Sequence, residues 1–217
     1  MTREEQRYLR ELKKPFETAC RSVGKRRGWK SISGIQYQVR NGMLYELFPD
    51  LSWADRGKAL KAWLCCKPVV LDEMYWDVFH MREEAAKMPF SFHVNGAFTA
   101  PVYTLDRWKT PLPGPEILKE AVDALLDQAE ALVEEHPFPT LADFRRAVET
   151  EPANSGRTLN IVLCLLCEGA YEEAAREITA ALARGEDGGF LRMDGKQGIL
   201  EDARDWCAER AAEELGL

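Results

Sequence analysis

Alternating apolar and polar positions dominate the first third of the chain. In residues 35–40 the apolar side chains fall on every second position, which is the period of a strand with one buried face. Asn41-Gly42 follows directly, and this dipeptide tolerates the positive φ values of a two-residue hairpin turn. Residues 43–48 return as the partner strand, and residues 60–66 repeat the alternation. The pattern predicts an antiparallel meander.

Helical spacing flanks these strands. Apolar residues recur every three or four positions in residues 8–23, and Pro15 inside this pattern should kink the helix or begin a new one. Another helix is expected after the strands, with Asp72 as its N-cap. Residues 90–94 alternate again and predict a fourth strand, and residues 102–105 predict a short fifth one.

The proline-rich segment 108–115 is expected to be an extended connector, and every periodic stretch beyond it is helical. The expected helices lie within residues 117–133, 140–148, 159–166, 171–183 and 199–215. The third of them is apolar nearly all round, which predicts the buried centre of the second half. The fold class is therefore α+β: an N-terminal helix with an antiparallel meander of four or five strands, followed by an all-helical C-terminal subdomain. We predict domains at residues 1–110 and 111–217, with the second packed on the first.

The composition is that of a soluble globular protein. The chain has 217 residues, of which 46% are hydrophobic and 30% are charged. The longest apolar run, residues 161–167, is far shorter than the ~20 residues that a membrane-spanning helix needs, so no membrane association is expected. The first residues carry acids and no apolar secretory stretch, which predicts a cytoplasmic protein. Six cysteines in such a chain indicate free thiols rather than a disulfide framework.

Charge is distributed unevenly. Residues 1–110 carry 19 basic and 13 acidic side chains, whereas residues 111–217 carry 10 and 23. This asymmetry indicates either a basic binding surface beside an acidic one, or two regions that attract each other.

No established catalytic motif is present. The sequence lacks a G-x-S-x-G, a P-loop and a dinucleotide-binding fingerprint. Its C-x-x-C, formed by Cys164 and Cys167, lies inside the predicted buried helix, whereas a redox pair normally sits at a helix N-terminus. No second pair of zinc ligands accompanies it. We therefore predict no metal site, no cofactor and no catalytic residue from motifs.

Arg26, Arg27 and Trp29 stand in a basic loop before the first strand. The cations could neutralise phosphates while Trp29 stacks on a base. The pI of about 5.2 disfavours nucleic acid as a partner. The alternative is that Trp29 anchors the core and that the cations pair with the acidic helices.

Trp63 and His93 are the other candidate binding residues. Both are expected on strands, where they could share the outward face of the sheet. Such a face is either covered by a helix or open to a partner, and aromatic residues are enriched at binding hot spots. A catalytic site assembled around His93 and Cys65 is a further alternative, because catalytic groups meet in space and not in sequence.

Residues 169–174, Gly-Ala-Tyr-Glu-Glu-Ala, together with Ile178 and Ala181, resemble the second helix of a tetratricopeptide repeat. No second copy follows at the repeat's period of ~34 residues. The resemblance therefore implies one helical hairpin and no repeat array.

Residues 1–105 resemble in layout a bacterial domain family of unknown function. The matching segments are Leu12-Lys-Lys-Pro15-Phe16, the basic stretch up to Trp29, and residues 35–39 and 90–98. In that family a kinked helix with a basic end leads to a meander, a short helix and a last strand. The resemblance implies a fold and a bacterial setting, and it implies no reaction.

The function expected from these patterns is that of a non-enzymatic bacterial protein-interaction module. Such a module would bind another protein through the sheet face or an acidic helical surface. By analogy alone, it could be an immunity protein that neutralises a toxin. The alternatives are an enzyme with a site around His93 and a nucleic-acid-binding protein that uses residues 21–30. The oligomeric state does not follow from the sequence.

Overall fold

The computed structural model describes residues 2–54, 57–95, 98–188 and 198–214, and the fold class is α+β as predicted. The chain folds into two compact units. The sheet unit comprises Met1–Cys66 and Tyr103–Pro137, and the helical unit comprises Lys67–Val102 and Phe138–Leu217. Each unit therefore combines two separate stretches of the chain. The domains expected at residues 1–110 and 111–217 stay a prediction.

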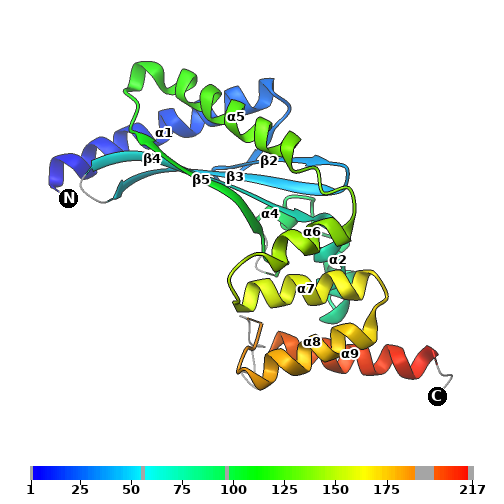
Figure 1. Ribbon diagram of the computed structural model, residues 1–217. Helices are drawn as coiled ribbons and strands as arrows, with labels where there is room; N and C mark the ends of the chain where they lie inside the picture. Colours follow the sequence, from blue (N-terminus) through cyan, green and yellow to red (C-terminus); the bar gives the residue numbers. More distant parts are fainter. Residues whose placement is uncertain (1, 55–56, 96–97, 189–197, 215–217) are drawn as a thin grey trace. The chain divides into compact units, whose positions relative to one another are not determined.

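The sheet is a five-stranded antiparallel meander in the spatial order β1-β2-β3-β4-β5 (Figure 1). Its strands are β1 (Lys30–Ile32), β2 (Ile35–Arg40), β3 (Met43–Ala54), β4 (Gly57–Pro68) and β5 (Tyr103–Pro111). The predicted hairpin turn is confirmed, because Asn41 and Gly42 have φ values of 51° and 78° between β2 and β3. The last two residues of β4 belong to the helical unit.

Two helices of the sheet unit, α1 (Arg3–Arg26) and α5 (Leu118–Glu135), lie next to each other on one side of the sheet (Figure 1). A short 3₁₀ turn, η1 (Pro115–Ile117), precedes α5. α1 is a single helix with Pro15 in its interior, so no new helix begins there. Its buried apolar stripe consists of Leu12, Phe16, Ala19, Cys20 and Val23. This stripe packs against the sheet and α5, and it accounts for the helical periodicity of the sequence.

The strand predicted at residues 90–94 is wrong. This segment contains the short helix α4 (Phe92–Asn95), and the amides of Phe92 and His93 donate to the carbonyls three residues earlier. Alternation over five residues is too short to separate a strand from a helical turn. Two further helices precede it, α2 (Val69–Val78) and α3 (Arg82–Ala85). Pro68, and not Asp72, is the N-cap of α2.

Two predicted loop segments are partly strands. Residues 108–111, expected in the proline-rich connector, belong to β5, which extends the predicted fifth strand. Pro111 fits there because β5 is at the edge of the sheet, where a missing N–H costs no ladder hydrogen bond. Pro49, expected in a turn, lies in β3 beyond the described pairing with β2, which ends at Leu47. The other expected turn includes residues 55–56, which lie outside the described residues.

The helical unit contains the predicted second-half helices α6 (Leu141–Glu149), α7 (Ser155–Cys167), α8 (Tyr171–Ala183) and α9 (Ile199–Glu214). α7 is buried nearly all round and contacts α2, α6 and α8, so it is the centre of this unit. Gly169, with φ of 73°, turns the chain between α7 and α8 and forms the expected helical hairpin. No helix in the described parts of the chain is long and apolar enough to cross a membrane.

Candidate functional site

The basic loop at the end of α1 is tied to α5. The Arg27 guanidinium donates to Asp123 Oδ1 at 3.1 Å, to Asp127 Oδ1 at 2.6 Å and to Glu130 Oε2 at 2.6 Å. The Trp29 indole N–H donates to Glu130 Oε1 at 3.0 Å, and the Trp29 side chain is buried. Both residues therefore join α1 to α5 within the sheet unit.

This network limits what the loop offers to a ligand. Three carboxylates match the charge of Arg27, and buried Trp29 presents no open ring for a base to stack on. Arg26 is exposed. Nucleic-acid binding by Arg26, Arg27 and Trp29 stays a prediction, and it would require Arg27 and Trp29 to leave these partners.

The predicted pairing of Trp63 and His93 on one sheet face is wrong. Trp63 is on β4 in the sheet unit, whereas His93 is on α4 in the helical unit. Trp63 stacks beside Phe48 of β3, with ring centroids 6.3 Å apart and an interplanar angle of 14°. Each of the two predicted binding residues therefore has its own surroundings.

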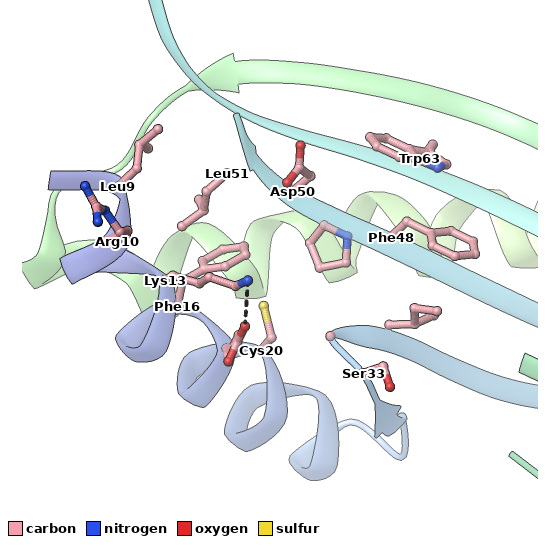
Figure 2. Close-up of a pocket in the computed structure, with 14 residues that line it drawn as sticks. Leu9, Arg10, Lys13, Phe16, Cys20, Ser33, Phe48, Asp50, Leu51 and Trp63 are labelled. Carbon is pink, nitrogen blue, oxygen red and sulfur yellow. Dashed lines mark ion pairs between the residues drawn. The ribbon is translucent and has the colours of Figure 1, made fainter. Parts of the chain in front are cut away.

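Trp63 and Phe48 line a pocket of about 480 Å³ in the sheet unit. Figure 2 shows α1 along one wall, with Phe16 and Cys20 directed toward the strands that carry Phe48 and Trp63. Gly34, in the turn between β1 and β2, completes this end of the lining. The walls are mostly apolar, and the charged side chains of the lining are Arg10, Lys13 and Glu17 of α1 and Asp50 of β3.

In the helical unit, His93 belongs to a buried network centred on Asp72. The Asp72 carboxylate is 0% exposed and Lys67 is 1% exposed. Lys67 Nζ donates to Asp72 Oδ1 at 2.8 Å, and the Ala100 amide donates to the same oxygen at 2.7 Å. The Nδ1–H of His93 donates to Asp72 Oδ2 at 2.8 Å. Lys67 Nζ also donates to the Ala100 carbonyl at 3.3 Å.

Aromatic rings hold the His93 imidazole in place. The centroids of Trp76 and Phe90 each lie 4.7 Å from that of His93. Trp76 also stacks on Phe92 at 5.5 Å, and its indole N–H donates to the Phe98 carbonyl at 2.7 Å. The ring of His93 is therefore fixed by packing as well as by its bond to Asp72.

Large apolar side chains of the segment that carries this histidine face solvent. Met88 is 51% exposed, and Phe90 and Phe98 are each 38% exposed. We call these three residues together with His93 the aromatic surface. The His93 side chain is 11% exposed, so only a small part of it is accessible to solvent.

The arrangement around His93 can orient an imidazole for proton transfer. A buried carboxylate on Nδ1 fixes the tautomer and leaves Nε2 as the proton acceptor. Within the described residues, no serine, threonine or cysteine side chain is hydrogen-bonded to His93. The cluster therefore resembles a general base, His93, that is oriented by a carboxylate, Asp72. No nucleophile is hydrogen-bonded to it within the described residues.

The cysteines are packed as apolar groups. All six are free. Burial raises the pKa of the Cys20 thiol to about 12 and the pKa of Cys207 to about 11, and it also raises the pKa values of Cys164 and Cys167. These thiols are therefore protonated at neutral pH. No cluster of three potential metal ligands occurs within the described residues.

Sequence reasoning missed Lys67 and Asp72. The signal for them was present, because the two charges flank the apolar run from Pro68 to Leu71. A charge in such a stretch is buried only with a partner. The sequence did not indicate that His93 and the backbone of Ala100 would complete the set.

Comparison with known proteins assigns no family. The chain matches no family model, no curated protein and no solved structure. The resemblances to a bacterial domain family and to a tetratricopeptide hairpin therefore stay predictions.

Glu130→Gln should lower the free energy of unfolding and should make that free energy depend less steeply on pH. Burial raises the pKa of Glu130, but the hydrogen bonds from Arg27 and Trp29 outweigh this, and the folded-state pKa lies below its usual 4.5. The ionised carboxylate therefore stabilises the fold above that usual pKa, and this contribution is lost as the pH falls through the folded-state pKa. At pH 7 the variant should lose about 1.5–3 kcal/mol of unfolding free energy, the range for hydrogen bonds to charged groups.

Urea unfolding between pH 7 and pH 3 measures this effect. Glu134→Gln removes an exposed carboxylate from the same helix and is the matched control. A pH dependence of Glu130→Gln as steep as that of the wild type would contradict the assignment.

Lys67→Met should destabilise the protein by about 3–5 kcal/mol, the range for leaving one partner of a buried ion pair without the other. Adding Asp72→Asn should recover part of the loss, because it removes the uncompensated charge. Denaturant unfolding at pH 7 measures both effects. Lys87→Met, at an exposed position, should change the unfolding free energy by no more than about 0.5 kcal/mol. Equal losses for Lys67→Met and Lys87→Met would contradict the buried network.

Proposed function

We propose that the chain is a non-enzymatic protein-interaction module and that it binds its partner through the aromatic surface. The exposure of Met88, Phe90 and Phe98, in the segment that also carries His93, is the observation that carries this proposal. Aromatic residues and methionine are enriched where protein interfaces are buried, and a few such residues supply most of the binding energy.

The rigidity of this surface supports the proposal. Phe90 packs on the His93 ring, which Asp72 and Trp76 hold in place. The carbonyl of Phe98 is bonded to Trp76. A side chain that is already ordered loses less conformational entropy when it binds, so such anchors favour affinity.

The net charge bears on the kind of partner, and the free cysteines bear on the compartment. The net charge of −7 disfavours nucleic acid as the partner. Six free cysteines suit the reducing cytoplasm, which is where we place the protein. An immunity protein of a bacterium, which neutralises a toxin by binding it, is one form of this function, and that step rests on analogy alone.

The double variant Phe90→Ala/Phe98→Ala should bind the partner at least about tenfold more weakly, because it removes two aromatic anchors. The tagged wild-type chain is first used to recover the partner from a lysate of the source organism. Calorimetry with the purified partner then measures the dissociation constants of the wild type and the variant.

The matched control is Val39→Ala/Ile117→Ala, which truncates two apolar side chains of the sheet unit that are 45% and 48% exposed. Its dissociation constant should stay within about twofold of that of the wild type. Equal weakening by both double variants, or a wild-type chain that recovers no partner from its own lysate, would refute the proposal.

General acid–base catalysis by His93 is a second candidate function. The bond between His93 Nδ1 and the buried Asp72 carboxylate favours it, because this arrangement leaves Nε2 to accept a proton from water or a substrate. The aromatic surface would then hold an apolar part of the substrate next to the imidazole.

Under this second function, His93→Asn should slow the hydrolysis of p-nitrophenyl acetate and butyrate by at least about 100-fold, the lower range for loss of a general base. Asn keeps an N–H for Asp72 and lacks a basic nitrogen. The initial rates at pH 7 measure the effect. His80→Asn is the control, because His80 is exposed and its φ of 54° suits Asn. Equal rates for the wild type and His93→Asn would exclude this function.

A further inference from the structure

The pocket beside α1 lies in the sheet unit and takes no part in the protein-binding proposal. We propose that it binds an elongated aliphatic monocarboxylate, a ligand with the chemistry of a medium-chain fatty acid. Its alkyl chain would lie against Phe48 and Trp63, and its carboxylate would face Arg10.

The size and shape of the pocket support a small ligand. Its volume of about 480 Å³ lies within the range of ligand pockets, roughly 300–1,000 Å³. Lining residues of α1 extend from Leu9 to Cys20, a stretch of several helical turns at about 1.5 Å per residue. Figure 2 shows Leu9 and Arg10 at one end and the aromatic pair Phe48 and Trp63 at the other. The lining therefore suits an extended molecule.

The deep part of the pocket is apolar and unreactive. Phe16 and Cys20 are both buried, and they face the ring pair of Phe48 and Trp63. Burial raises the pKa of the Cys20 thiol to about 12, so the thiol stays protonated and provides an apolar contact. This end favours a hydrocarbon chain and binding without reaction.

The charge of the α1 wall favours an anionic end. Of the charged side chains that α1 contributes to the lining, Arg10 and Lys13 are basic and Glu17 is acidic. The Arg10 Nε donates to the Gln6 carbonyl, and within the described residues the terminal nitrogens of Arg10 have no hydrogen-bond or ion-pair partner. The other basic lining residue, Lys13, is 4.0 Å from Glu17. A guanidinium with free terminal nitrogens can bind a carboxylate through two parallel hydrogen bonds.

Two acidic side chains line this pocket: Glu17 of α1, which pairs with Lys13, and Asp50 of β3, whose charge opposes the ligand. Asp50 is exposed and has no ion-pair partner in the described part of the chain. Its carboxylate should repel an anionic ligand, so the effects of Arg10 and Asp50 on affinity should have opposite signs.

Titration of the purified chain with octanoate tests the proposal. Amide chemical shifts at Gly34 and the indole N–H shift of Trp63 locate binding, and calorimetry measures the dissociation constants. Octanoate should bind in the pocket at least about fivefold more tightly than the uncharged octanamide. Decanoate should bind about tenfold more tightly than octanoate, because two further methylenes are buried.

Charge variants complete the test. Arg10→Gln should weaken octanoate binding at least threefold, whereas Asp50→Asn should strengthen it. Arg7→Gln removes an equal charge from the same exposed helix outside the pocket and is the matched control. The proposal would be overturned by the absence of binding, by octanamide binding as tightly as octanoate, or by equal effects of Arg10→Gln and Arg7→Gln. None of these outcomes depends on the partner sought at the aromatic surface.

Discussion

The buried carboxylate of Asp72 is the constraint on which the helical unit's candidate site depends. A carboxylate that is removed from water is stable only when charge and hydrogen bonds replace its hydration. Lys67 and the Ala100 backbone meet this requirement from the two ends of the segment that joins β4 to β5. The network therefore joins the two ends of this segment to each other. The second oxygen of Asp72 accepts from His93 and orients its ring.

The sheet unit uses the same physics in a more exposed setting. Arg27 and Trp29 together satisfy Glu130, which stays 23% exposed, so water screens part of the interaction. The desolvation cost is smaller here, and so is the cost of removing one partner. In the sheet unit, the Arg27 ion pairs join the end of α1 to α5. In the helical unit, the buried Asp72 carboxylate orients His93. The Arg27 network also accounts for part of the uneven charge distribution, because a cation from residues 1–110 pairs with carboxylates from residues 111–217.

Sequence patterns predicted the elements whose side-chain periodicity is local. They did not predict the sites that are assembled from residues far apart in the chain. Residues 35–40 form a strand and α7 is buried, because the side-chain pattern of each reports its own environment. Residues 90–94 satisfy the same alternation and yet form a helical turn, since five residues are too few to separate the two periods. Asp72 has the chemistry of an N-cap, but its partners at positions 67, 93 and 100 come from outside the first turn of its helix. Trp63, which the sequence indicated as a binding residue, lines a pocket with Phe16 and Cys20, and these two come from a helix whose approach no local pattern encodes.

Both candidate surfaces are kept open by rigid groups behind them. Full burial of a phenylalanine is worth about 1.5–3 kcal/mol, so exposed Phe90 and Phe98 forgo stabilisation that a collapsed surface would gain. Phe90 packs on the His93 ring and the Phe98 carbonyl accepts from the Trp76 indole, so both residues are attached to groups that hydrogen bonds hold in place. In the sheet unit, the pocket has the aromatic rings of Phe48 and Trp63 as one wall, and these belong to paired strands that cannot move independently toward α1. Openness in both places is therefore a consequence of rigid backing, which is also the property that lowers the entropic cost of binding.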